Sequence, residues 1–144
     1  MPPRPDVNIA TVYFDDRGSV YCPMDNLDRD GIKRTYVVRN WSAGRIRAWH
    51  GHREAWTGMH VIKGAAKLIA RNMDEASDIS SVVLSDKNPG IFWIPPGYYN
   101  GSITLEDDTR ILVYSTLSFD EVKGDDHRAE LTSEDRELFE VKDR

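Results

Sequence analysis

The chain has 144 residues, which is enough for one domain with a full hydrophobic core and too few for two comfortable ones. Hydrophobic residues make up 40% and charged residues 30%, and no apolar run approaches the roughly 20 residues that a membrane helix needs, so we expect a soluble globular protein. The formal net charge of −5 argues against a general nucleic-acid binder. A single cysteine, Cys22, and the absence of an apolar signal-peptide segment in MPPRPDVN predict a cytoplasmic protein.

The first part of the chain predicts short strands separated by polar turns. Residues 1–8 contain three prolines and are expected to form an arm or an edge segment and not a folded element. The turn Asp15–Gly18 is expected to join two strands into a hairpin, and the polar loop 23–31 leads to a third strand. Alternating and β-branched residues place these three strands at 9–14, 19–22 and 32–39.

The second part continues the same pattern up to a terminal helix. Lys63-Gly64 and Glu106-Asp107-Asp108 each separate two apolar runs, so we expect a hairpin at each place. Acidic residues near the start of 130–141, with Lys142 and Arg144 just after its end, predict a helix there. The further strands are expected at 59–62, 65–71, 81–84, 91–94, 102–105 and 109–116. Many short strands with a turn every eight to twelve residues are typical of a single all-β domain, a sandwich or jelly roll spanning 1–144.

The stretch from Gly44 to Gly64 has the composition of a binding or catalytic site. In a strand, residues i and i+2 point to the same face, so His50 and His52 are expected to project into one pocket, with Gly51 leaving room between them. A polar edge strand with two unrelated surface histidines is the alternative, because His-x-His is a short motif. Two imidazoles, two guanidinium groups and two indoles fall within ten residues: Arg47, Trp49, His50, His52, Arg53 and Trp56.

The spacing of these residues resembles the two conserved motifs of the cupin superfamily. His50-x-His52 lies between the glycines at the ends of this stretch, and Gly90 leads to Pro95-Pro96-Gly97. The resemblance implies a double-stranded β-helix, the cupin jelly roll, with its site in the open mouth. Metal-binding cupins also carry a glutamate where Thr57 stands and a histidine where Asn100 stands. Zinc and iron sites generally use three or more protein ligands, so the shortfall predicts a site without metal.

A closer resemblance is to two groups of nucleotide-sugar cupins, the dTDP-4-dehydrorhamnose 3,5-epimerases and the dTDP-4-keto-6-deoxyglucose 3,4-ketoisomerases. Tyr114 resembles the catalytic tyrosine of the epimerases, whereas His52 and Phe119-Asp120-Glu121 resemble the ketoisomerases. As a set, these motifs are more specific than any one of them. The other matching segments are Asp16-Arg17-Gly18, Ile32-Lys33-Arg34-x-Tyr36 and Arg47-Ala48-Trp49-His50.

The resemblance implies a role for each matching residue. It assigns His50 as the base, Tyr114 as the acid, and Arg17 and Arg47 as ligands of a nucleotide diphosphate, with His52 as a second catalytic histidine. Guanidinium groups suit this task because each can hold two phosphate oxygens at once. The remaining expected substrate contacts are Arg34, Tyr36, Thr57 and Asn100. The aspartate that orients the histidine of the epimerases has no clear counterpart here, and Asp125 and Asp126 are the nearest candidates.

The chemistry expected of such a site is proton abstraction from a carbon next to a ketone. A neutral histidine serves as the base if the developing enolate is stabilised, so no redox cofactor is needed. Epimerisation requires groups on both faces of the sugar, which Tyr114 and His50 would supply, and we favour this branch. A 3,4-ketoisomerisation, for which His50 and His52 are better placed, is the alternative. A homodimer is implied by the resemblance. A sugar-nucleotide binder without activity and a metal-dependent dioxygenase are the competing interpretations.

Overall fold

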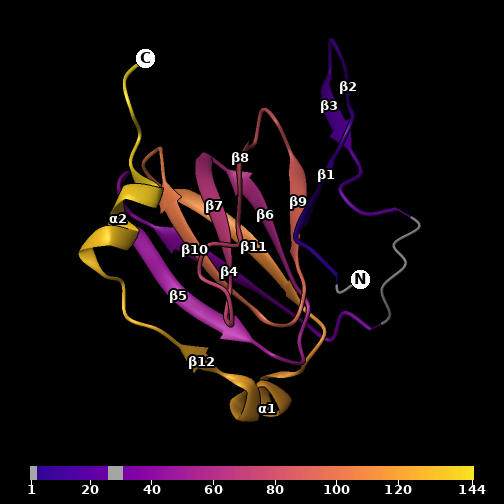
Figure 1. Ribbon diagram of the computed structural model, residues 1–144. Coiled ribbons are helices and arrows are strands. Elements are labelled where there is room, and N and C mark those ends of the chain that lie inside the picture. Colours follow the sequence, from indigo (N-terminus) through magenta and orange to yellow (C-terminus); the bar gives the residue numbers. More distant parts are fainter. Residues whose placement is uncertain (1–2, 26–30) are drawn as a thin grey trace.

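Two antiparallel sheets face each other in the computed structural model, which describes residues 3–25 and 31–144 (Figure 1). Within that part of the chain each sheet has five strands. The first sheet has the order β1 (Asp6–Ile9), β9 (Gly90–Ile94), β6 (Thr57–Lys63), β11 (Thr109–Ser115) and β4 (Arg34–Asn40). The second has the order β12 (His127–Arg128), β5 (Ile46–His52), β10 (Tyr98–Thr104), β7 (Ala65–Asn72) and β8 (Ile79–Ser85). The predicted all-β jelly roll is confirmed.

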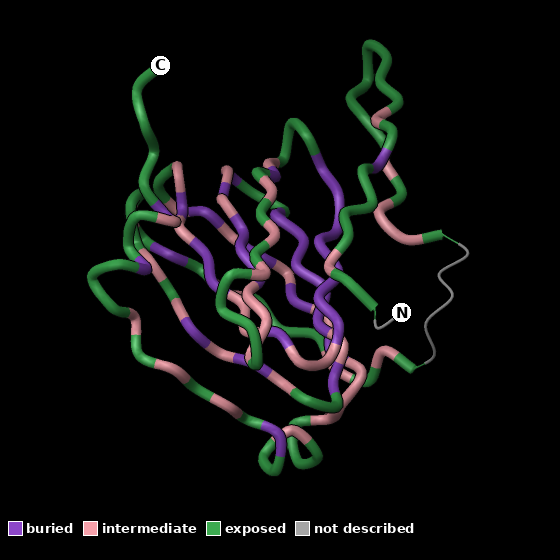
Figure 2. The backbone as a smooth tube through the Cα atoms, viewed as in Figure 1, coloured by how far each residue is buried: buried purple, intermediate pink, exposed green. Residues whose placement is uncertain are grey.

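The main hydrophobic core lies between the two sheets, where buried residues line the facing surfaces of the strands (Figure 2). Strands point alternate side chains to opposite faces, and β11 follows this rule, with Ile111 and Val113 buried inside and Leu112 and Tyr114 on the other face. The core fills only one part of the space between the sheets. Its buried members are Met59, Val61, Ala66, Leu68, Ala70, Leu84, Phe92, Ile94, Tyr98, Ile111 and Val113.

A smaller core lies on the outer side of the second sheet, under the C-terminal helix α2 (Ser133–Phe139). Phe139 is 0% exposed and its ring centroid lies 5.4 Å from that of Trp49 on β5. The indole N–H of Trp49 donates to Asp135, which also accepts from Arg71 at 2.7 Å. Helix α2 therefore covers the back of the strand that carries the histidine pair.

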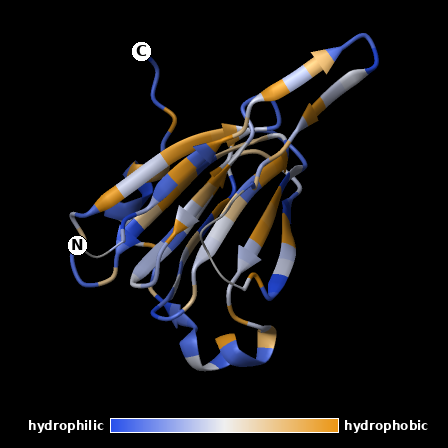
Figure 3. Cartoon of the chain, turned by 90° about the vertical axis from the view of Figure 1, so that its right-hand side faces the viewer, coloured by the Kyte–Doolittle hydropathy of each residue, from blue (hydrophilic) through white to orange (hydrophobic). Residues whose placement is uncertain are grey.

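The hairpin of β2 (Val12–Asp15) and β3 (Gly18–Tyr21) forms a third, two-stranded sheet that extends away from the body of the protein (Figures 1 and 3). Its apolar side chains face solvent: Tyr13 is 71%, Phe14 81% and Val20 73% exposed. The predicted hairpin in this region is confirmed. A hairpin with this much exposed apolar surface is not stabilised by its own core.

Three expectations about neighbouring elements differ from the structure. The segment Asp6–Ile9 belongs largely to residues 1–8, which were expected as an arm or an edge segment and not as a folded element. It is strand β1, which pairs with β9 and forms an edge of the first sheet. The runs on either side of Lys63-Gly64 are strands, but β6 and β7 belong to different sheets, and the same is true of β10 and β11. These turns are corners between layers and not hairpins. A short apolar run has the same sequence pattern in a hairpin and at a corner between two sheets, because the strand buries one face in both.

The helices also differ in part. The terminal helix α2 begins three residues later than expected and ends at Phe139 instead of 141. A short helix α1 (Phe119–Val122), followed by the 3₁₀ turn η1 (Lys123–Asp125), was not expected. The sequence does contain a helix-start signal for α1. This is a capping box, in which Ser118 and Glu121 exchange side-chain and backbone hydrogen bonds. Part of the predicted loop 23–31 lies outside the described residues.

Candidate active site

A cavity of about 470 Å³ opens between the two sheets and is closed on one side by the segment from α1 to β12. Polar and charged side chains gather in it, next to the apolar core. Sites that bind small molecules are commonly concave and combine an apolar wall with a few converging polar groups. The lining residues are Arg34, Tyr36, Val38, Arg47, His50, His52, Thr57, Met59, Asn100, Ser102, Ile111, Val113, Ser115, Phe119, Val122, Lys123, Asp126 and Arg128.

Most of the side chains proposed from the sequence meet in this cavity, although they come from four strands. Two do not reach it. Arg17 lies on the projecting hairpin, and Tyr114 points to the opposite face of β11. The seven that line the cavity are Arg34, Tyr36, Arg47, His50, His52, Thr57 and Asn100.

Strand β5 contains an irregularity that brings Arg47 to the same face as the histidines. Asn100 on β10 pairs with His50, whereas Ser102, two residues later, pairs with Arg47. Strand β5 therefore has one extra residue at this point, as in a β-bulge, so Ala48 and Trp49 both face the outer core. Arg47 lies an odd number of residues from His50 and from His52. Without the extra residue, it would therefore point to the face opposite the histidines.

His50 lies in surroundings that keep its imidazole neutral. Burial lowers the pKa of His50, and the positive charge of Arg128 lowers it further, against an opposing effect of Asp126; His52 and Arg47 contribute in the same direction as Arg128. A neutral imidazole carries a lone pair, which is what a general base needs. His50 thus has the protonation state of a proton acceptor at neutral pH.

His52 is held by the segment that follows α1. Its Nδ1 lies 2.6 Å from the main-chain carbonyl oxygen of Asp125, and only 15% of its side chain is exposed. Since a carbonyl oxygen only accepts, Nδ1 carries the proton and donates it. In the neutral ring, Nε2 is then the nitrogen that carries the lone pair, so it is the atom of His52 that can accept a proton from a substrate.

Cationic side chains provide a site for an anion in the same cavity. The guanidinium group of Arg34 lies 4.6 Å from the ring centre of Tyr36 and 5.1 Å from that of Phe119, which fixes it between two aromatic faces. Arg47 donates from Nε to Asn40 Oδ1 at 2.7 Å, and within residues 3–25 and 31–144 its terminal nitrogens have no hydrogen-bond or ion-pair partner. Guanidinium groups held in this way suit phosphate oxygens.

Tyr114 belongs to a separate cluster on the outer face of the first sheet. Its hydroxyl lies 3.3 Å from Nδ1 of His60, and the hydroxyl of Tyr21 lies 3.1 Å from Nε2 of the same ring. His60 is 4% exposed, which is consistent with a structural role for its ring. The assignment of Tyr114 as the acid partner of His50 does not fit this placement, because the sheet lies between the two side chains.

Arg17 is likewise not a ligand of the cavity in its own chain. Its side chain is 86% exposed and pairs with Asp15 at 2.6 Å in the hairpin turn. Conversely, the sequence did not point to Lys123, Arg128 or Ser102 as cavity residues. Lys123 lies in the η1 turn and Arg128 in the two-residue strand β12, and both elements are too short to show a helix or strand periodicity in the sequence. No sequence pattern could therefore indicate where their side chains point.

Among the described residues there is no group of three or more His, Cys, Asp or Glu side chains arranged to hold a metal ion. A search of the same residues for a helix with the length and apolarity to cross a bilayer likewise finds none.

Comparison with known proteins agrees with this geometry. Residues 13–129 match the family model described as FdtA: WxcM-like, C-terminal. The chain belongs to this family. The matched range contains the whole cavity and the β2–β3 hairpin, and it excludes α2.

One relative of the chain is an enzyme that acts on a dTDP-linked sugar. The dTDP-4-dehydrorhamnose 3,5-epimerase of Methanothermobacter thermautotrophicus is 31% identical over 108 residues, or 67% of this chain. The chain spans 58% of the length of that relative. Among solved structures, the rmlC epimerase of Mycobacterium tuberculosis has a TM-score of 0.75 at 17% identity, over 88% of this chain and 68% of that one.

A second solved structure comes from the ketoisomerases. A double mutant of the QdtA 3,4-ketoisomerase from Thermoanaerobacterium thermosaccharolyticum, in complex with TDP, has a TM-score of 0.71 at 19% identity and covers 90% of each chain. At such identities the structural similarity establishes the shared cupin fold. It confirms the fold expected from the sequence.

Proposed function

We propose that the protein is an isomerase that moves a proton next to the ketone of a dTDP-linked 4-keto-6-deoxy hexose. The observation that carries the proposal is that two histidines, His50 and His52, line one cavity together with a set of arginines. A base removes the proton from the carbon beside the ketone, and a nearby donor stabilises the enolate oxygen that forms. No cofactor takes part in this reaction. The family assignment and the named relatives support the substrate class.

The geometry favours 3,4-ketoisomerisation over epimerisation. In this reaction one proton leaves carbon 3 and one is added at carbon 4, while the ketone moves from carbon 4 to carbon 3. Both steps occur on neighbouring carbons, for which two histidines side by side on β5 are suited. An epimerase needs an acid on the opposite face of the ring, and Tyr114 is not in the cavity to provide it.

Epimerisation next to the ketone remains the second candidate, favoured by the 31% identity to a 3,5-epimerase. Tyr36, which lines the cavity from β4 in the opposite sheet to His50, is then the acid. Burial raises the pKa of Tyr36 and the charge of Arg34 acts against this, so the phenol keeps its proton at neutral pH.

The diphosphate is bound by Arg34 and Arg47, with Arg128 and Lys123 adding positive charge around it. Asn100 and Thr57 offer hydrogen bonds to sugar hydroxyl groups from opposite sheets. All of these side chains come from elements that face the same space. The exposed aromatic face of Phe119, at the cavity wall, offers a surface on which a nucleobase can stack.

A homodimer located in the cytoplasm completes the proposal. The projecting hairpin exposes Tyr13, Phe14 and Val20, and a second copy of the chain would cover them. In such a dimer Arg17 reaches the cavity of the partner, which reconciles its expected role with its position. A mixture of Arg17→Ala and His50→Asn subunits then regains activity, because one cavity per heterodimer is complete. No recovery in verified heterodimers would contradict this part of the proposal.

The reaction is tested by proton NMR of dTDP-4-keto-6-deoxyglucose with the protein in deuterated water. A product with its ketone at carbon 3 establishes the ketoisomerase, and deuterium at carbon 3 or 5 with an inverted centre establishes the epimerase. His50→Asn and His52→Asn should each abolish turnover, whereas Tyr114→Phe should retain it. Binding without exchange would instead identify a nucleotide-sugar binder, and neither binding nor exchange would refute the substrate class.

A further inference from the structure

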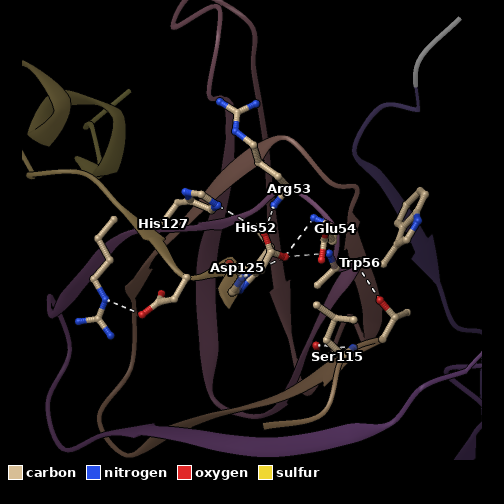
Figure 4. Close-up of polar contacts among 12 residues, drawn as sticks. His52, Arg53, Glu54, Trp56, Ser115, Asp125 and His127 are labelled. Carbon is tan, nitrogen blue, oxygen red and sulfur yellow. Dashed lines mark hydrogen bonds and ion pairs between the residues drawn. The ribbon is translucent and has the colours of Figure 1, made fainter. Parts of the chain in front are cut away.

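The Asp125 carboxylate is buried beside the histidine pair and has no role in the chemistry described so far. Its side chain is only 3% exposed, although it is absent from the cavity lining. It lies at the end of the η1 turn, between the end of β5 and the short strand β12 (Figure 4). A buried carboxylate needs compensating donors, so its partners reveal what it holds in place.

Those partners are the backbone N–H groups directly after β5 and the ring of His127, whose Nε2 lies 3.4 Å from Oδ1. The Oδ1 atom accepts from the N–H of Arg53 at 2.7 Å, and Oδ2 accepts from those of Glu54 and Ala55 at 3.0 and 3.1 Å. Burial acts to raise the pKa of Asp125, but these three donors and the nearby His52 lower it, and the net displacement is downward. The carboxylate is therefore ionised and fixes the turn that begins one residue after His52.

The same residue binds the His52 ring through its main chain. The 2.6 Å hydrogen bond from Nδ1 of His52 ends on the carbonyl oxygen of Asp125, so one residue fixes both the backbone after His52 and the direction of its side chain. Four hydrogen bonds thus connect two segments that lie 70 to 73 residues apart in the sequence.

We propose that Asp125 is the positioning residue of His52: it holds the ring in the Nδ1–H tautomer and directs Nε2 into the cavity as the proton-transferring atom. The role in proton transfer rests on the proposed isomerase function. In the nucleotide-sugar epimerases that the chain resembles, a late aspartate is expected to orient the histidine at the position of His50. Here the aspartate is bound to the other histidine.

The charge of Asp125 adds to this effect when His52 accepts a proton. Its Oδ2 lies 4.0 Å from Nδ1 of His52, close enough to stabilise the imidazolium ion. Around His50, by contrast, Arg128, Arg47 and the neighbouring imidazole oppose a positive charge. Different environments of two neighbouring titratable groups assign them different roles. His52 is the member of the pair that holds the proton between its removal and its return.

The first test needs no variant and no substrate. In ¹⁵N- and ¹³C-labelled wild-type protein, long-range ¹H–¹⁵N spectra at pH 8 distinguish the two neutral tautomers of each histidine. We expect His52 to be in the Nδ1–H form. A ring in the Nε2–H form, or an even mixture of the two, would overturn the proposal, whatever the outcome of the turnover assay.

The second test compares Asp125→Asn with Asp74→Asn. Asp74 also accepts from Arg53, but from its side chain at the surface, so it is a matched control for a lost carboxylate near the same turn. We expect Asp125→Asn to reduce the Nδ1–H population of His52 and to lower kcat by about 10- to 100-fold with little change in KM, by analogy with the loss seen when the hydrogen-bond partner of a metal-ligating histidine is removed. Asp74→Asn should change neither value.

The positioning role would be overturned by a folded Asp125→Asn protein in which His52 keeps its wild-type tautomer. This holds whether kcat falls or not. If the tautomer shifts as expected but the wild-type protein turns over neither ketoisomerase nor epimerase substrates, the arrangement of His52 stands and the proposed reaction fails.

Discussion

Gly51, between the two histidines, is the position where a single methyl group is expected to disturb the site most directly. An ideal Cβ built there lies 2.8 Å from the carbonyl oxygen of Tyr98 and 2.8 Å from Cδ1 of Tyr99, besides 2.2 Å from Cε of Met73. The methionine end can rotate away, but the carbonyl belongs to β10, which pairs with β5 at this point. Gly51→Ala must therefore push the neighbouring strands β5 and β10 apart.

The expected cost follows from two opposing contributions. Overpacking in a well-packed region costs about 1–3 kcal/mol. Replacing glycine by alanine also restricts the unfolded chain, which stabilises the folded state by about 0.4–1 kcal/mol. The centres of the two ranges give a net loss of about 1.3 kcal/mol, with an upper limit of about 2.6 kcal/mol. At about 3 °C per kcal/mol for a chain of this size, the midpoint of thermal unfolding falls by about 4 °C.

The matched control is Gly124→Ala, in the η1 turn. An added Cβ there meets nothing within 4 Å, and the residue does not have a positive φ. Thermal unfolding followed by circular dichroism should show an unchanged or slightly raised midpoint for this control and a lowered one for Gly51→Ala. The same preparation of Gly51→Ala should also lose turnover, because both histidines flank the displaced residue. Equal midpoints for the two variants would refute the reasoning.

Three further predictions concern stability. Phe139→Ala should cost about 3–5 kcal/mol in chemical denaturation, because the ring is 0% exposed against Trp49, whereas Phe119→Ala, whose ring is 61% exposed, should stay within about 0.5 kcal/mol. Burial lowers the pKa of His60 below its ordinary value of 6.5, so its contribution to stability is present above pH 6.5 and is lost as the pH falls through the folded-state pKa. His60→Gln should therefore flatten the fall in thermal stability between pH 7.5 and 5; an unchanged slope would contradict this. Arg17→Ala should leave the unfolding midpoint of the monomer unchanged, since its side chain is 86% exposed and contacts only its own hairpin turn.

Much of this fold could be predicted because the strands carry regular alternation and their turns carry glycine, proline and aspartate. The partners of the strands could not. Ala65 follows Lys63-Gly64 as it would in a hairpin, yet β7 pairs with β10 and β8, and not with β6. Which sheet a strand joins is decided by contacts far away in the sequence, and these leave no local pattern.

The candidate site, too, could be predicted only in part from the sequence. His50 and His52 could be placed in one pocket because they follow the period of a regular strand. Tyr114 was assigned by resemblance, and its side chain faces away because Val113 and Ser115, its neighbours on β11, are the residues that line the cavity. Asp125 could not be connected to His52, since the hydrogen bond uses its main-chain carbonyl, which every residue possesses.

The extra residue in β5 has a consequence for how this cavity tolerates changes in chain length. Because Ala48 and Trp49 both face outward, opposite Gly101, the strand consists of two segments whose inward positions are out of phase. Deleting one of the two residues would restore regular alternation and turn either the arginine or the histidine pair out of the cavity. Substitutions at Ala48 alter only the outer core, whereas an insertion or a deletion there reverses the orientation of half the site. Homologues with this combination of arginine and histidines are therefore expected to vary in sequence along β5. They should keep the same number of residues between the arginine and the histidine pair.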